Sequence, residues 1–203
     1  RAWSYLPGQR RVKVAPDFSH DTPNPGTAGG NTFDDIFIFN GSMDRYDFKL
    51  VGKKEMFVPY NAYAAVYGAK QDDLLKANHL NPDLVRWEQH RVWVVEATLR
   101  EGKRHVYSKR TFYLDEDSWA VIAYEGWDHS NKLFRVMFSN GAVNYAQGGF
   151  LSYASSMQSY DVSRGQYTAL QTQLAEGSYV RNEVPYWPEA KLSPSSMTQR
   201  GVR

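Results

Sequence analysis

Between residues 84 and 138 the chain alternates between β-prone runs and short polar turns, and this pattern constrains the fold more than any other feature. The runs are rich in Val, Phe, Tyr and Trp, which favour strands, and the turns carry Gly, Asp, Asn and Ser. Turns this short join antiparallel neighbours, so the segment predicts a four-stranded antiparallel meander. The predicted strands are residues 84–99, 104–114, 119–127 and 133–138, and the predicted turns are residues 101–103, 115–118 and 128–132.

The segments that flank this meander are less regular. The first sixteen residues hold two short extended runs around a Pro-Gly turn, and a loop rich in Pro and Gly follows. Residues 49–60 predict a strand that Gly52 interrupts and Pro59 ends. A short helix is expected around residues 72–78, because acidic residues stand in its first turn.

The alternation fades beyond residue 138, where Gly, Ser, Tyr and Pro become frequent. We therefore expect a curved antiparallel sheet domain over residues 1–138. Residues 139–203 are expected to form an irregular extension that packs on the same domain, with an extended tail at its end.

Both faces of the predicted meander carry apolar bulk. Side chains alternate across a strand, and a sheet with one solvated face shows cleaner polar alternation than these runs do. Two half-apolar faces fit a curved sheet that leaves a hollow for an apolar ligand, and they fit equally a sheet covered on both faces by its own chain. Size and strand parity select four residues as the wall of such a hollow: Trp87, Trp93, Phe112 and Trp119.

Composition limits the classes of function. The 203 residues suit one domain, or one domain with a tail. The absence of cysteine excludes disulfides, thiolate metal sites and thiol nucleophiles. A net charge of +2 gives no support for nucleic-acid binding, and no glycine-rich nucleotide loop is present, so no cofactor is expected. No run of 18 apolar residues occurs, so no helix is expected to span a membrane.

The titratable residues give no recognised catalytic or metal-binding motif. The five histidines lack the spacing that puts two ligands on one face, so no metal site is assigned. A site made by His90 and His105 across the hairpin, with Glu88, is the alternative. Ser19, His20 and Asp21 are adjacent, but triads are assembled from distant positions, so no catalytic residue is predicted.

Clusters of like charge favour structural roles. The acidic groups at residues 34–35 and 115–117 stand where turns and helix starts prefer acids. A basic hairpin is compatible either with anionic headgroups or an acidic partner, or with a solvated edge that opposes aggregation. Its residues are Lys103, Arg104, Lys109 and Arg110, with Arg86 and Arg91 nearby.

Several long runs resemble one family of exported Gram-negative proteins, classified as domain of unknown function 1329. The runs are RAWSYLPGQRRVKVAP, DTPNPGTAGG, FNGSMDRYDFKLVGKKEMFVPYN, HLNPDLVRWEQHRVWVVEATLREGKRHVYSKRTFYLDEDSW and YDVSRGQY. The resemblance implies a mainly β fold like that of the lipoprotein carriers LolA and LolB: an open, curved antiparallel half-barrel with a few short helices. Members of the family are usually longer, with more chain ahead of the first run, and the family supplies no catalytic residue.

The residues and the resemblance together predict a non-enzymatic binder or carrier of a lipid or other apolar ligand. The expected location is the periplasm or the periplasmic face of the outer membrane, and the expected context is an envelope export system. The expected partners are that ligand and an envelope transporter or outer-membrane protein. A structural or adaptor subunit of an envelope transport assembly is the alternative, and a hydrolase that uses His90 or His20 is a weaker one.

Overall fold

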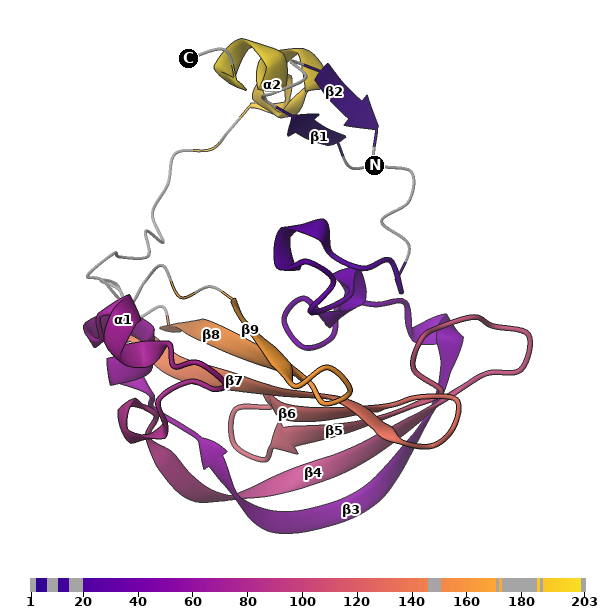
Figure 1. Ribbon diagram of the computed structural model, residues 1–203, viewed down its shortest axis with the longest axis vertical. Helices are drawn as coiled ribbons and strands as arrows, with labels where there is room; N and C mark the ends of the chain where they lie inside the picture. The colour runs from indigo at the N-terminus through magenta and orange to yellow at the C-terminus, as the bar shows by residue number, and fades with distance from the viewer. Residues whose placement is uncertain are drawn as a thin grey trace.

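Seven antiparallel strands form one open sheet in the computed structural model (Figure 1), which describes residues 3–6, 11–14, 20–145, 151–170, 172, 186 and 188–201. Each strand pairs with the next one along the chain, and β3 and β9 are the two edges. The expected mainly β fold with an open antiparallel sheet is therefore confirmed. The strands are β3 (Tyr46–Pro59), β4 (Trp87–Leu99), β5 (Lys109–Asp115), β6 (Val121–Trp127), β7 (Leu133–Tyr145), β8 (Leu151–Asp161) and β9 (Gln166–Leu170).

The sheet is longer than the sequence predicts. The expected boundary at residue 138 falls inside β7, and β8 pairs with β7 from Arg135 opposite Asp161 to Tyr145 opposite Leu151. An irregular conformation was therefore the wrong expectation for residues 139–145 and 151–170. The end of β7 and β8 lack a continuous run of apolar side chains on a buried face, because some of their buried side chains are polar. Asn140 of β7, for example, donates a hydrogen bond to Gln158 of β8 over 2.7 Å.

Both ends of the chain form a small unit of their own. Strands β1 (Trp3–Leu6) and β2 (Arg11–Val14) pair antiparallel, which confirms the two extended runs, although the Pro-Gly turn between them lies outside the described residues. Helix α2 (Pro194–Gly201) contacts both strands (Figure 1), and the short helix η8 (Glu189–Leu192) precedes it. The prediction of an extended tail is therefore wrong for residues 189–201. Ser193 caps α2, and Pro194 is the first residue of that helix, where proline is favoured.

The structure corrects the predicted bounds of one strand and one helix. Strand β5 begins at Lys109 rather than at residue 104, because residues 104–108 turn inward and bury His105 and Tyr107. The expected helix at residues 72–78 is the single turn α1 (Gln71–Leu74). The break at Gly52 is present as an irregularity in the pairing of β3 with β4, and such a bulge bends a strand.

The sheet has two buried faces, named here after neighbouring residues of β7. The Met137 face carries Ala97, Phe112, Tyr124 and Met157 beside Met137, and Ile38 from residues 20–45 packs on it. The Phe138 face carries Val92, Tyr113 and Ala123 beside Phe138, and the connection of residues 60–86 packs beside them. Both faces are thus largely covered by the chain itself, which was one of the two alternatives left open by the sequence.

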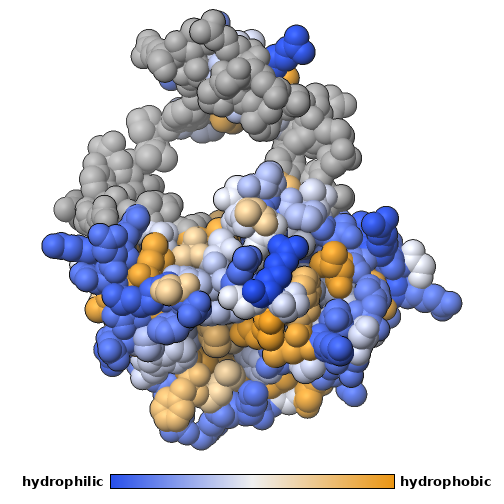
Figure 2. Space-filling view, viewed as in Figure 1, coloured by the Kyte–Doolittle hydropathy of each residue, from blue (hydrophilic) through white to orange (hydrophobic). Residues whose placement is uncertain are grey.

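The covering segments contain only short helical turns. Residues 20–45 include η2 (Pro25–Thr27), η3 (Phe33–Asp35) and η4 (Met43–Arg45), and residues 60–86 include η5 (Ala64–Gly68), α1 and η6 (Pro82–Leu84). None of the helices in the described part of the chain has the length and apolar character needed to cross a membrane. Figure 2 shows apolar residues gathered over the sheet, with charged residues around them.

Candidate functional site

The structure places the four aromatic residues predicted to line a hollow at three different sites. Phe112 is only 4% exposed in the core of the Met137 face, where Phe39 lies edge-on with ring centroids 5.3 Å apart. Trp93 and Trp119 stack on each other at 6.3 Å, and Trp119 is 66% exposed. Trp87 lies apart from these three, with its ring 6.0 Å from that of Phe138. Their role as ligand-binding residues stays a prediction.

Trp87 borders an apolar pocket of about 270 Å³ between the sheet and the connection of residues 60–86. The sheet contributes Trp87 from β4, Phe138 from β7 and Tyr160 from β8. The rings of Phe138 and Tyr160 are 6.4 Å apart and nearly perpendicular. The whole lining is His79, Leu80, Pro82, Val85, Trp87, Phe138, Gln158 and Tyr160.

The connection forms its side of the pocket through local hydrogen bonds. Asn81 begins η6 and accepts a hydrogen bond from the backbone of Asp83, and the Val85 N–H donates to the carbonyl of Pro82. This turn holds Leu80 and Val85 against the sheet, where both are at most 5% exposed. These residues carry no periodic pattern in the sequence, although the Asn-Pro dipeptide marks the turn that positions them.

A second cavity of about 400 Å³ lies between residues 27–30, β8 and β9, and it is lined mainly by polar groups. Ser159, Asp161 and Arg164 face it, together with the backbone of Gly30. Ser159 donates a hydrogen bond to the Gly30 carbonyl over 2.9 Å, so part of the wall is tied to the covering segment. The larger cavity is therefore the less apolar of the two.

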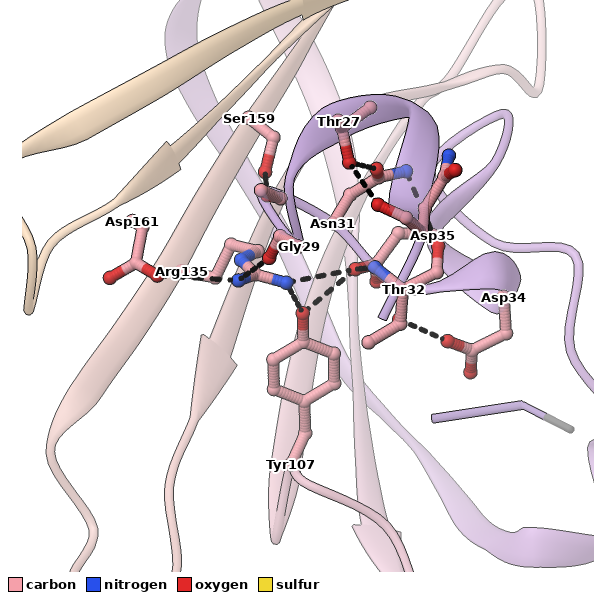
Figure 3. Close-up of polar contacts among 12 residues, drawn as sticks. Thr27, Gly29, Asn31, Thr32, Asp34, Asp35, Tyr107, Arg135, Ser159 and Asp161 are labelled. Atoms are coloured by element: carbon pink, nitrogen blue, oxygen red, sulfur yellow. Dashed lines mark hydrogen bonds and ion pairs between the residues drawn. The ribbon is translucent and has the colours of Figure 1, made fainter. Parts of the chain in front are cut away.

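Beside this cavity, an ionic network is buried under residues 20–45 (Figure 3). Arg135 lies 3.4 Å from carboxylate oxygens of both Asp35 and Asp161, and it donates to the Tyr107 hydroxyl over 2.7 Å. Tyr107 in turn donates to Asp35 over 2.8 Å. The network thus joins β7 and β8 to the covering segment.

Arg110 of β5 forms the other half of this network. Its Nη2 lies 2.9 Å from Asp34 and 3.3 Å from Asp35, and its side chain is wholly buried. The guanidinium also lies 4.7 Å from the ring centre of Tyr107, within cation–π distance. Arg110 is therefore an interior residue and does not belong to the basic hairpin surface that the sequence suggested.

The electrostatics of the network favour its ionised carboxylates. Burial of Asp34 opposes ionisation, but the hydrogen bond with His105 and the charge of Arg110 outweigh it and lower the pKa of Asp34 to about 2. Burial raises the pKa of Tyr107 well above its ordinary value, so its hydroxyl stays protonated as a donor. These groups hold fixed protonation states near neutral pH, which suits a structural role.

The histidines considered for chemistry have separate environments. His105 Nε2 lies 3.0 Å from Asp34 in the interior, whereas His90 stands on β4 opposite Met56 and 3.2 Å from Asp115. A shared site of His90 and His105 is therefore wrong, because His90 lies near the start of β4 and His105 lies just before β5, at the opposite end of the hairpin. His20 Nδ1 accepts a hydrogen bond from the Ser42 backbone, and Ser19 lies outside the described residues.

The fold of this chain is similar to those of two solved structures, and the similarity indicates the class of fold. It is similar to a domain assigned as an outer membrane lipoprotein-sorting protein from Vibrio parahaemolyticus, with a TM-score of 0.50 at 15% identity over 82% of this chain and 55% of that one. It is also similar to a DUF1329 family protein from Desulfovibrio piger, with a TM-score of 0.57 at 16% identity over 96% of this chain and 63% of that one. The chain therefore has an open β-sheet fold of the lipoprotein-carrier type.

The chain belongs to the DUF1329 family, a family of unknown function whose model matches residues 1–198. Among curated proteins it is 39% identical over 208 residues to the uncharacterized protein PA3922 of Pseudomonas aeruginosa strain PAO1. The alignment covers all of this chain and 44% of PA3922. The chain thus spans about half the length of this relative.

Proposed function

We propose that this protein binds an apolar ligand, such as the acyl chain of a lipid, and carries it within the Gram-negative envelope. The observation that carries the proposal is the apolar pocket beside Trp87. Its aromatic and aliphatic lining offers no activated nucleophile, and burial alone can hold a hydrocarbon, at roughly 25 cal/mol per Å² of apolar surface. The proposed role is accordingly binding without catalysis.

The size of the pocket limits what it accepts. A volume of about 270 Å³ lies just under the range of roughly 300–1,000 Å³ that is usual for drug-sized ligands. The pocket therefore suits one acyl chain end rather than a whole lipid. Trp87 is 42% exposed, so one side of its ring remains open to the rest of such a ligand.

The lining of the pocket also includes two polar side chains. Gln158 from β8 and His79 from the connection line it beside the apolar residues. His79 Nδ1 lies 2.7 Å from the Leu80 carbonyl, which leaves its other ring nitrogen for a headgroup. A few polar groups in an apolar lining are typical of ligand pockets.

The similarity of fold to the Vibrio lipoprotein-sorting domain supports a location in the envelope and a carrier role. The adaptor alternative rested on an irregular segment after residue 138, and much of that segment belongs to the sheet. The hydrolase alternative rested on His20 and His90, whose nearest polar partners are a backbone N–H and carboxylates. The binding proposal is therefore the one that the geometry favours.

Titration of the purified chain with a fluorescent fatty acid tests this proposal. Trp87→Glu places a charge at the mouth of the pocket, and we expect at least a tenfold loss of affinity, or about 1.4 kcal/mol. Trp119→Glu is the matched control, because Trp119 is exposed and does not line the pocket, and it should retain affinity within about twofold. Equal affinity in all three proteins would exclude the pocket as the binding site.

A further inference from the structure

Three residues with metal-binding side chains meet where β4 passes the β5–β6 turn. Within the described residues, His90, Asp115 and Asp117 are the group of His, Cys, Asp or Glu whose ligand atoms all lie within 4.8 Å of one another. His90 comes from β4, Asp115 ends β5, and Asp117 lies in the following turn. This cluster is separate from the apolar pocket lined by Trp87.

One oxygen of Asp115 is fully engaged, and the other has no hydrogen bond. Oδ2 accepts from the backbone N–H and hydroxyl of Ser118, over 2.8 and 2.6 Å, and from the Tyr60 hydroxyl over 3.2 Å. Oδ1 is buried without a hydrogen-bond partner, and the side chain as a whole is 0% exposed. An ionised oxygen buried in this way is costly unless a cation faces it.

His90 is oriented as a metal-binding histidine would be. Its Nδ1 points to the Asp115 side and lies 3.2 Å from Oδ1, while its Nε2 lies 3.4 Å from Glu88. A carboxylate at the second ring nitrogen fixes the tautomer that leaves the first nitrogen free to bind metal. The ring also stacks on Tyr60, with centroids 3.8 Å apart, which limits its rotation.

The spacing of these atoms fits a small divalent ion. A tetrahedral ion with bonds of about 2.0–2.1 Å holds its ligand atoms about 3.3 Å apart, close to the separation of His90 Nδ1 and Asp115 Oδ1. Asp117 is exposed, so its side chain can rotate to complete a third bond. Glu116 does not compete, because it pairs with Lys53 and Arg91.

We propose that His90 Nδ1, Asp115 Oδ1 and a carboxylate oxygen of Asp117 bind one divalent transition-metal ion, with Zn²⁺ as the preferred ion. One imidazole with carboxylates suits Zn²⁺ better than Ca²⁺ or Mg²⁺, which take oxygen ligands. The bound ion joins the start of β4 to the β5–β6 turn and leaves a position open to solvent beside Asp117. The inference is independent of the proposed lipid carrier role.

Calorimetric titration of the chelator-treated full chain with Zn²⁺ tests the site. We expect one ion per chain, a higher melting temperature, and at least a tenfold loss of affinity in both His90→Gln and Asp117→Asn. Asp117 is exposed, so Asp117→Asn keeps the test valid if a change at the buried Asp115 prevents folding. Glu88→Gln removes the orienting carboxylate, together with the ion pair between Glu88 and Arg86, and should weaken binding by about 10–100-fold.

His79→Gln and Asp72→Asn are the matched controls, since both residues lie in the connection of residues 60–86 and outside the cluster. They should bind Zn²⁺ as the unmodified chain does. Co²⁺ is a second probe, because its visible absorption reports nitrogen and oxygen ligation directly. The proposal is overturned if neither ion binds at about 100 μM, or if His90→Gln binds Zn²⁺ with unchanged affinity.

Discussion

Asp34 and Arg110 meet in the interior although 75 residues separate them in the chain, and the Arg110 Nη2 lies 2.9 Å from the Asp34 carboxylate. The two side chains are at most 2% exposed. The contact fastens residues 20–45 to β5 at the Met137 face. Because this segment also packs Ile38 and Phe39 on the sheet, the ion pair helps to determine whether that face is closed.

Asp34→Asn is expected to destabilise the protein by about 3–5 kcal/mol, because it leaves the buried charge of Arg110 less compensated. Urea unfolding followed by tryptophan fluorescence measures the change. Asp47→Asn is the control, since Asp47 forms an exposed pair with Arg100 and should cost about 1 kcal/mol or less. Similar losses in the two variants would contradict the structural importance assigned to Asp34.

The lowered pKa of Asp34 predicts how the stability of the protein depends on pH. The pKa of Asp34 is about 2 in the folded protein, below its ordinary value of 3.8, so its contribution is fully present above pH 3.8 and is lost as pH falls through 2. The shift corresponds to about 2 kcal/mol. The difference in unfolding free energy between the unmodified chain and Asp34→Asn should narrow by about this amount on acidification to about pH 2. A constant difference across that range would argue against a lowered pKa.

The central strands could be predicted from local sequence, but the last two could not. Residues 84–138 alternate between strand-forming runs and turns, and both signals are local. In β8 the buried positions include Ser156, Gln158 and Ser159, which violate the apolar pattern of a half-buried strand. Their burial depends on partners in β7 and in residues 20–45, such as Asn140 and Gly30, and local sequence does not reveal these contacts.

The candidate sites, too, depend on contacts that local sequence does not reveal. Strand parity and size selected Trp87, yet Leu80 and Val85, which face it across the pocket, come from a connection without periodicity. The sequence also suggested His105 as a partner for His90, because the two residues flank one hairpin. The actual register brings Asp115 opposite Val92, and thus beside His90. Which residue of β5 lies beside His90 depends on the pairing register of β4 with β5. Composition and residue spacing do not determine that register.

The close packing around Gly126 predicts that any side chain at this position would clash with its neighbours. A Cβ at this position would lie 2.4 Å from the Tyr124 hydroxyl and 3.0 Å from two ring carbons of Tyr107. Tyr107 cannot move easily, because its hydroxyl is bound by Asp35 and Arg135. We expect Gly126→Ala to cost about 1–3 kcal/mol in thermal or urea unfolding. Gly68→Ala is the control, because its nearest neighbour would be 3.9 Å away, and a loss of equal size there would contradict this explanation.

Phe112 distinguishes a closed Met137 face from an open hollow. Its ring is enclosed by Phe39 at 5.3 Å and Tyr124 at 5.4 Å, so Phe112→Ala should leave a cavity and cost about 3–5 kcal/mol. Trp119→Ala removes a larger but mostly exposed ring and should cost about 1 kcal/mol or less. Urea unfolding measures both changes. A loss below about 1 kcal/mol for Phe112→Ala would mean that residues 20–45 do not hold the face closed, and the Met137 face would then compete with the Trp87 pocket as the site of an apolar ligand.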